Sequence, residues 1–386
     1  MDFELSQEQK LIRESVRDFA EREIKPLAPI LDDKQEFSVE LTRKIGEMGL
    51  FGMIVSPDYG GQGLDYISYI IAVEEIARID GSQAATVAAH NSLGVNPLYY
   101  FGTEEQKKKY VPRLCTGEGL WGFGLTEPDA GSDSRASKTT AVLENGKWRI
   151  NGSKIFITNA SAEISLGSTV QAVSGEKDGK KEFSAIIVEQ NTPGFIAKSM
   201  HNKMMWRASN TAELYFDDCI VPEENILGKR GDGSKIMLNT LDHGRLSIAA
   251  MGLGCAQGAF ELAVRYAQQR IQFGKPISAN QVVGNKLADM ALKIELARNL
   301  LYKACWLKDN KKPFAKEAAM SKLYCAEIAN EVAYEALQIH GGYGLMKDYD
   351  IERFYRDQRL LQIGEGTSEI QRLVISRYII DEYPAQ

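Results

Sequence analysis

The sequence predicts an α+β protein in three parts: a helical N-terminal region (residues 1–122), a middle antiparallel β region (123–234) and a C-terminal helical bundle (235–386). Apolar residues recur with helical spacing in the first and last parts. Two Asn-Gly pairs lie between β-prone segments in the middle part, and such pairs are the strongest short hairpin signal. The length of 386 residues also suits two or three domains.

The N-terminal part carries helix-start signals. Ser6 and Gln9 have the spacing of a capping box, and Val16 and Phe19 follow on one apolar helical face. Thr103 is the expected N-cap of a further short helix over 104–114. These signals predict helices at both ends of the region.

After about residue 122 the residue pattern changes from helical spacing to β-prone segments. The pairs Asn145-Gly146 and Asn151-Gly152 each predict a hairpin turn. Further β-prone segments continue the pattern at 182–189, 194–200 and 211–222. We expect an antiparallel sheet.

The C-terminal part returns to long amphipathic helices. The stretches 279–309 and 316–340 both have apolar residues at helical spacing over many turns. Long helices in sequence, joined by short connections, predict a helical bundle.

The composition narrows the possible functions. The net charge of −6 gives no broad basic surface for nucleic acid, so an anionic substrate would need local cationic residues. The five cysteines form no CxxC pair and the four histidines are scattered, so a metal cluster is not expected. The N-terminal residues lack the features of a signal peptide, and no uninterrupted apolar run is long enough to span a bilayer. We therefore expect a reduced, soluble, cytoplasmic protein with no metal, nucleic-acid or membrane partner.

A single acid between two glycines is the most unusual feature near the C-terminus. In "GEG", Glu365 stands between Gly364 and Gly366, which strip side-chain cover from the loop and allow close backbone approach. The structural alternative is a helix start, with Ser368 as N-cap and Gln371 completing a capping box. That alternative accounts for the start of the helix but not for a glutamate placed between two glycines.

Two motifs in the middle part could hold a ligand. "GLTEPDAGSD" at 124–133 combines the hydroxyls of Thr126 and Ser132 with small residues, although an ordinary turn would look similar. "KIFIT" at 154–158 places Phe156 and Thr158 on one strand face, which suits stacking and hydrogen bonding to a flat heteroaromatic ring. A buried core phenylalanine is the alternative for Phe156.

Three weaker signals lie in the helical C-terminal part. Asp242 and Arg245 are three residues apart on one side of a helix, where a solvent-facing ion pair is the alternative. "RIQFG" at 270–274 sets a cation beside an aromatic residue. "QIHGGYG" at 338–344 ends a helix with glycines, as a C-cap would.

Together these motifs resemble those of the acyl-CoA dehydrogenase family, in order and approximate spacing, over essentially the whole chain. Phe156 stands where the family often has Trp, and the C-terminal third looks most like the short-chain branch. The resemblance implies an N-terminal helical domain, a middle β domain and a C-terminal four-helix bundle. It also implies FAD as cofactor, a homotetramer built as a dimer of dimers, and electron-transfer flavoprotein as the electron acceptor.

The resemblance also implies roles for individual residues. Contacts to flavin within one subunit would come from Leu125, Thr126, Ser132, Phe156, Ile157 and Thr158. Contacts to the FAD of the neighbouring subunit would come from Arg270, Phe273, Gln281, Gln338, Gly341 and Gly342, with Thr367 and Glu369 completing the site. The acyl-CoA channel would be lined by Ser132, Asp242, Arg245, Gly364 and Gly366.

By the same resemblance, Glu365 is the base that removes the α-proton of an acyl-CoA, while the β-hydrogen leaves as hydride to flavin and a 2-enoyl-CoA forms. Hydrogen bonds to the thioester oxygen, from a flavin ribityl hydroxyl and the Glu365 backbone amide, would stabilise the developing enolate. An apolar acyl chain would expel water and raise the pKa of Glu365 towards a useful base strength. Such an enzyme would serve the degradation of fatty, branched or cyclic acids.

The substrate is less defined, because this chain departs from the family's usual "YEGT" by placing Gly364 before the acid. An enlarged pocket would favour α- or β-substituted, branched or alicyclic acyl groups. Alternatively, Gly364 only relaxes the loop. His90 and Asn91 could add polar groups to the acyl pocket or serve a helix end, and Trp206 has no assigned role.

Other activities on the same fold stay open. An acyl-CoA oxidase and an enoyl-CoA reductase would use the same flavin and base, and rates with oxygen and with electron-transfer flavoprotein would separate them. A non-catalytic scaffold that binds CoA or a protein partner would have lost the base or the flavin contacts, whereas Glu365, Thr126, Thr158 and Arg270 are all present.

Overall fold

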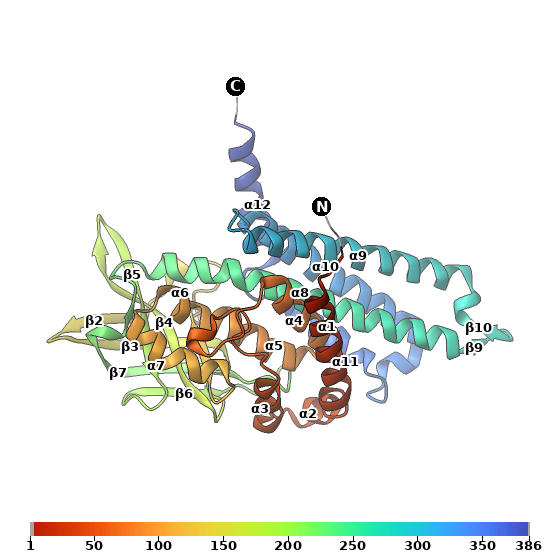
Figure 1. Ribbon diagram of the computed structural model, residues 1–386, viewed down its shortest axis with the longest axis horizontal. Helices are drawn as coiled ribbons and strands as arrows, with labels where there is room; N and C mark the ends of the chain where they lie inside the picture. The colour runs from red at the N-terminus through yellow and green to blue at the C-terminus, as the bar shows by residue number, and fades with distance from the viewer. Residues whose placement is uncertain (1–3, 385–386) are drawn as a thin grey trace.

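A computed structural model describes residues 4–384, so residues 1–3 and 385–386 of the predicted first and third parts lie outside it. The N-terminal part is helical (Figure 1). The predicted capping box of Ser6 with Gln9 is confirmed. The predicted N-cap Thr103 is also confirmed, and the structure adds that it forms a capping box with Gln106. The helices are α1 (Gln7–Phe19), α2 (Ala28–Lys34), α3 (Val39–Glu47), α4 (Tyr66–Ala77), α5 (Gly81–Ala89), α6 (Asn96–Phe101) and α7 (Glu104–Cys115), with π-helical segments at Ala20–Ile24 and His90–Val95.

The middle part forms an eight-stranded sheet in the order β6-β7-β3-β2-β4-β5-β8, with β1 paired to β4. Its pairings are antiparallel except that β4 runs parallel to both β1 and β2. The sheet encloses its own cluster of buried apolar residues, which includes Trp148 and Phe216. The strands are β1 (Leu120–Gly124), β2 (Thr140–Glu144), β3 (Lys147–Thr158), β4 (Ser165–Lys177), β5 (Lys180–Glu189), β6 (Phe195–Ser199), β7 (Thr211–Pro222) and β8 (Ile226–Leu227).

Only one of the two predicted Asn-Gly turns exists. Asn145 and Gly146 both have positive φ and join β2 to β3 as predicted. Asn151 and Gly152 instead lie inside β3, so the second turn prediction is wrong. Gly152 sits at a shift in register, and a Cβ there would come within 2.7 Å of the Thr139 Cα. The glycine therefore serves a bulge and a close strand contact rather than a turn.

The C-terminal part is helical and is organised around one long central helix, α8. Helices α9 and α10 pack along α8, and α12 contacts α10 before it projects away from the body (Figure 1). The elements are α8 (Gly233–Gln269), β9 (Ile271–Gln272), β10 (Lys275–Pro276), α9 (Gln281–Asp309), α10 (Ala315–His340), α11 (Ile351–Asp357) and α12 (Ser368–Glu382), with short 3₁₀ turns at Gly341–Leu345 and Gln358–Gln362.

Helix α8 belongs to a core that the N-terminal and C-terminal helices share. That core joins residues such as Ile70 and Val73 of α4 to Leu253 of α8 and Val332 of α10. By length and composition, α8 could cross a membrane, although charged residues such as Arg245 and Glu261 interrupt its apolar sequence. Its apolar window is 72% buried inside the protein, which is the state of a core helix. The α+β architecture of helices, β sheet and helices is confirmed.

Candidate active site

The acid singled out in the sequence lies in a strained loop between α11 and α12. Glu365 has φ 52° and Gly366 has φ 91°, so two consecutive residues adopt the left-handed region. For a non-glycine residue this conformation is uncommon and marks sites where geometry is held for function.

The predicted capping box after this loop is wrong. Thr367, not Ser368, is the N-cap of α12, because its Oγ1 accepts a hydrogen bond from the Ile370 amide. Gln371 does not return to a capping amide, since its Nε2 donates to the carbonyl oxygens of Glu365 and Gly366. The two left-handed residues place the chain so that these carbonyls, rather than an amide, meet the glutamine.

The Glu365 carboxylate points at the middle of α8. A Cβ built on Gly244 would lie 2.0 Å from Glu365 Oε2 and 3.1 Å from a Leu93 methyl. Oε2 is buried and has no hydrogen-bond partner within the described chain. A glycine inside a helix costs stability relative to alanine, so its use here reflects the room that the carboxylate needs.

Burial dominates the electrostatics of Glu365. Loss of hydration raises its pKa to about 7, and the positive charges of Lys322 and Arg245 partly oppose that rise. A carboxyl group with this pKa is a much stronger base than a solvated glutamate and still ionises near neutral pH.

Asp242 and Arg245 lie on α8, and the charge of Arg245 acts on the Glu365 carboxylate. They form an ion pair, and Arg245 is only 7% exposed, so the alternative of a solvent-facing pair is wrong. The Arg245 Nε atom is buried without a partner. Burial also raises the pKa of Asp242, while Arg245 lowers it. The pair thus presents a partly satisfied guanidinium towards the Glu365 region.

The motifs of the middle part meet at one edge of the sheet. The Ile155 amide donates to the Thr126 carbonyl, which ties the loop after β1 to the residue before Phe156. The buried Lys154 ammonium donates to Glu127 and to the Leu125 carbonyl, which fixes the same loop.

Phe156 is exposed, so the alternative of a buried core phenylalanine is wrong. It lies in a bulge of β3 with φ 62°, and its side chain is 63% exposed. Ile157 is buried, whereas Thr158 keeps part of its surface, so Phe156 and Thr158 can face one ligand. Ser132 is exposed in the loop nearby. An exposed ring held in a strained bulge fits a planar aromatic partner.

A second group of predicted residues lies far from the first. Arg270, Gly341 and Gly342 line an open cavity of about 550 Å³ at the end of α8 and α10. A Cβ on either glycine would meet nothing within 4 Å, and Gly341 confirms the predicted C-cap with φ 60°. The Arg270 guanidinium lies over the Tyr343 ring.

The remaining members of this second group are exposed in neighbouring segments of the chain. Phe273 is 97% exposed at the turn between β9 and β10, and Gln281 and Gln338 are exposed at the ends of α9 and α10. Figure 1 places β9 and β10 at the end of the molecule opposite to β3. One chain therefore does not bring the two groups together. Thr367 and Glu369 lie at the start of α12, and Glu369 is exposed.

His90 and Asn91 have structural partners. His90 is buried and bonds to the Leu114 carbonyl through Nε2, and burial lowers its pKa to about 4. Asn91 accepts from the Gly52 amide and donates to the Leu50 and Val87 carbonyls. Both belong to the π-helical segment His90–Val95, so the helix-end interpretation accounts for them.

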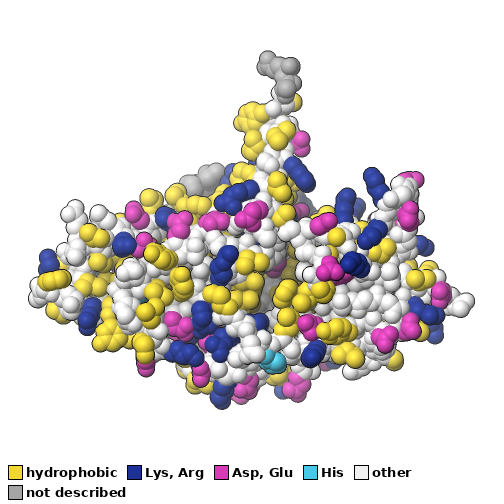
Figure 2. Space-filling model, turned by 180° about the vertical axis from the view of Figure 1, so that it is seen from behind, with side chains coloured by type: hydrophobic (Ala, Val, Ile, Leu, Met, Phe, Trp, Pro, Cys, Tyr) yellow, Lys and Arg dark blue, Asp and Glu magenta, His cyan; other side chains and the backbone are white. Residues whose placement is uncertain are grey.

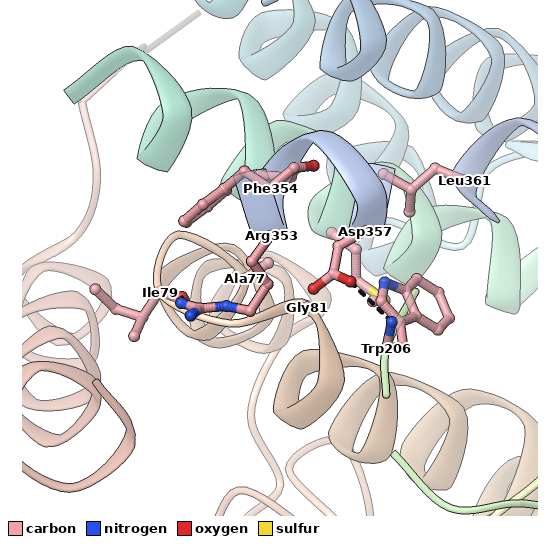
Figure 3. Close-up of a pocket in the computed structure, with 10 residues that line it drawn as sticks. Ala77, Ile79, Gly81, Trp206, Arg353, Phe354, Asp357 and Leu361 are labelled. Atoms are coloured by element: carbon pink, nitrogen blue, oxygen red, sulfur yellow. Dashed lines mark hydrogen bonds between the residues drawn. The ribbon is translucent and has the colours of Figure 1, made fainter. Parts of the chain in front are cut away.

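Trp206, which the sequence left without a role, packs in the interior (Figure 3). Its amide donates to Asp357 Oδ1, and the two residues flank Gly81 at a cavity of only about 10 Å³. Burial raises the pKa of Asp357 to about 7. Trp206 therefore connects the strand-rich part to α5 and α11 and does not face the acid at 365.

Two residues near Glu365 were not identified from the sequence. Gly244 gave only the weak signal of a lone glycine within a helix. Lys322 is fully buried on α10, between apolar positions such as Ala318 and Cys325, and its Nζ donates to the Gly366 carbonyl. A charged residue on the apolar face of a helical pattern was the signal that could have found it.

Comparison with known proteins identifies the family. Three family models match: acyl-CoA dehydrogenase N-terminal domain (6–118), middle domain (122–219) and C-terminal domain (231–380). The chain is 50% identical to the probable acyl-CoA dehydrogenase YngJ of Bacillus subtilis, over 98% of this chain and 100% of the relative. It is 44% identical to an acryloyl-CoA reductase (NADH) of Anaerotignum propionicum, over 98% of this chain and 96% of the relative.

Solved structures agree with this assignment. Butyryl-CoA dehydrogenase of Megasphaera elsdenii superposes with a TM-score of 0.95 at 41% identity, covering 98% and 100% of the two chains. A chain from work on the electron transferring flavoprotein of Acidaminococcus fermentans also gives 0.95, at 44% identity and the same coverage. An acyl-CoA dehydrogenase of Bacillus anthracis complexed with FAD gives 0.91 at 36% identity, over 98% of this chain and 69% of that one. The chain therefore belongs to the acyl-CoA dehydrogenase family, whose members are FAD-dependent oxidoreductases acting on CH–CH groups.

Proposed function

We propose that Glu365 is the base of an acyl-CoA dehydrogenase acting on a short acyl chain with a branch or ring near the thioester. The observation that carries the proposal is the Glu365 carboxylate, which is buried in part, has an unpartnered Oε2 and has a pKa of about 7. No hydrated glutamate would be basic enough for this task at neutral pH.

The residues at the sheet edge fit a flavin. The exposed Phe156 ring offers a stacking face, Thr158 offers a hydroxyl, and the loop of Leu125 and Thr126 is fixed beside them by Lys154. When bound, FAD supplies the acceptor for the hydride that leaves the β-carbon. The open cavity at Arg270, Gly341 and Gly342 suits a phosphate-bearing part of the cofactor, since a cation and bare backbone meet there.

The chain's own groups act on the α-carbon. Glu365 would take the α-proton onto its carboxylate as the α-C–H bond breaks, and the electron pair of that bond becomes part of the new α,β double bond. The Glu365 backbone amide makes no hydrogen bond within the described chain, so it is free to donate to the thioester oxygen. Such a donor stabilises the negative charge that develops there.

Glu365→Gln tests the base directly. The amide keeps the shape but accepts no proton, so the rate of flavin bleaching by butyryl-CoA should fall on the order of 100- to 10,000-fold. FAD content and acyl-CoA binding should stay the same. The control is Glu295→Gln on the exposed surface of α9. Bleaching at the parent rate in Glu365→Gln would remove Glu365 from the role.

The shape of the acyl group that the site accepts depends in this proposal on the space beside Gly364. A Cβ built there lies 3.5 Å or more from its nearest neighbours, which all belong to Leu360. These are ordinary contacts, so the space beside the loop has room for part of a substrate. This supports a substituted acyl group but leaves the relaxed-loop alternative open.

Gly364→Tyr separates the two interpretations. If substrate uses the space, kcat/KM for a branched or alicyclic acyl-CoA should fall at least about tenfold more than for butyryl-CoA, a difference of about 1.4 kcal/mol. Steady-state rates with isobutyryl-, 2-methylbutyryl-, cyclohexanoyl- and butyryl-CoA measure this. Equal losses on all substrates, with butyryl-CoA best for the parent, would leave a plain straight-chain enzyme.

Assembly, electron acceptor and direction belong to the same proposal. The separation of the two cofactor-binding groups within one chain supports a homotetramer in which neighbouring copies complete each site. Electron-transfer flavoprotein is the proposed acceptor, and the cytoplasm the proposed location. The divisions at residues 122 and 234 stay predictions.

A second candidate function is enoyl-CoA reduction, because one relative at 44% identity is an acryloyl-CoA reductase. Anaerobic assays in both directions, with electron-transfer flavoprotein as donor or acceptor, distinguish it. Faster consumption of enoyl-CoA than of acyl-CoA would favour the reductase. Fast turnover with oxygen alone would instead indicate an oxidase.

A further inference from the structure

We propose that Lys322 is a positioning residue for Glu365: its buried ammonium holds the loop through the Gly366 carbonyl and places an unshared positive charge beside the carboxylate. The proposal rests on the proposed role of Glu365 as base.

The contact itself is direct and enclosed. Lys322 Nζ donates to the Gly366 carbonyl at 2.6 Å, and the side chain has no exposed surface. Burying an ammonium costs free energy unless it is compensated, and an apolar residue of similar length would fill this position in a helix core at less cost. The charge therefore calls for a role beyond packing.

The carbonyl that Lys322 holds belongs to the residue directly after Glu365. Gly366 has φ 91°, and a Cβ there would lie 2.6 Å from Gln371 Nε2, so the loop conformation is tightly set. Other contacts from α10 hold the preceding segment: Glu327 accepts from Gln362, and Asn330 accepts from Gln358. Lys322 is the α10 residue that reaches the left-handed turn itself.

Charged and titratable groups approach Glu365 from three helices. Arg245 on α8 shares its charge with Asp242, and Tyr69 on α4 is buried and donates to the Ala88 carbonyl. Lys322 forms no ion pair within the described chain, although the charges of Glu365, Glu327 and Glu369 act on it. Its positive charge therefore acts on Glu365 without a bound counter-ion.

Both partners ionise close to neutral pH. Burial lowers the pKa of Lys322 to about 8, partly opposed by Glu365, while the pKa of Glu365 is raised to about 7. Removing the lysine charge takes away a group that stabilises the carboxylate. The pH at which Glu365 ionises must then move upward.

The experiment measures that pH in two ways. In the FAD-loaded enzyme, the infrared band of the Glu365 carboxylic acid is identified by its absence in Glu365→Gln. Its intensity is then followed as a function of pH. The rate of flavin bleaching by butyryl-CoA is followed over the same range. Lys322→Met and Lys322→Gln should both move the two midpoints upward by about one pH unit, the size expected for loss of an opposite charge nearby.

A matched control is Lys203→Met. Lys203 is also a largely buried lysine whose pKa is lowered to about 8, and it donates to the Ser209 carbonyl and Thr211 Oγ1. It should lose stability without moving either midpoint.

Lys322→Gln keeps a hydrogen-bond donor and serves if Lys322→Met does not fold. Unmoved infrared midpoints in the folded Lys322 variants would overturn the proposal. The infrared measurement also stands apart from the base assignment, since it reports Glu365 ionisation even if bleaching does not need Glu365.

Discussion

The most demanding position at the residue scale is Gly244, because it fixes the place of the carboxylate that the site uses. Any side chain there would have its Cβ 2.0 Å from Glu365 Oε2. The obstructing atom is the end of a flexible side chain, so the fold can tolerate a methyl group while the carboxylate cannot keep its position. A side chain at position 244 would therefore displace the Glu365 carboxylate and leave the backbone of α8 in place.

Gly244→Ala should therefore fold normally but lose activity. Displacing a reacting group by about 1 Å costs on the order of 100-fold in rate. Anaerobic bleaching with butyryl-CoA measures the rate, and thermal unfolding measures the stability. Gly284→Ala on α9 is the control, because its Cβ would meet only one atom, at 4.0 Å. A Gly244→Ala enzyme with the parent rate would contradict the placement of the carboxylate.

At the scale of single elements, the hairpin of β9 and β10 has the features of a segment that packs against another surface. Its turn residues Phe273 and Gly274 both have positive φ, which presents Phe273 almost fully to solvent. Arg270 begins this hairpin at the end of α8, beside the open cavity at Gly341. A two-stranded hairpin has little stability by itself, so it needs a surface to pack against.

Arg270→Ala should weaken both FAD retention and subunit association, because the proposed site gives this cation to the cofactor of a neighbouring copy. Flavin absorbance per polypeptide after dialysis and sedimentation of the purified protein measure the two effects. Arg265→Ala is the control, as Arg265 is an exposed arginine of the same helix that pairs with Glu261. Flavin content equal to that of the control would contradict the assignment.

At the scale of the whole molecule, the projecting helix α12 leaves apolar side chains without cover. Leu373, Ile380 and Tyr383 are 53%, 67% and 77% exposed, and Figure 2 shows hydrophobic side chains along this projection. The helix projects from the body (Figure 1), and its last residue, Glu382, still pairs with Lys316 of α10. Exposed apolar surface of this kind marks an interface, and in the proposed homotetramer its partner would be a second copy, which would also complete the separated cofactor groups.

Ile380→Glu should therefore lower the mass of the assembly in solution, since a carboxylate would be buried at the contact without a partner. Multi-angle light scattering at several protein concentrations measures the mass. Leu11→Glu on α1 is the control, because Leu11 is also an exposed apolar residue, at 53%. A parent protein that runs as a monomer would contradict the assembly outright.

The sequence by itself determined the order of helices, sheet and helices, several caps, the Asn145-Gly146 turn and the placement of one acid between two glycines at 365. These features depend on residues within one or two turns of each other, so they leave a local period or motif. Tertiary structure alone decided that Gly152 makes a bulge, that Thr367 caps α12, and that Phe156 is exposed. It also decided that Gly244 and Lys322 meet the Glu365 loop, and the lysine contact spans 44 positions of the chain. Contacts between distant segments have no local signature, because they arise only when the packing of the helices brings those segments together.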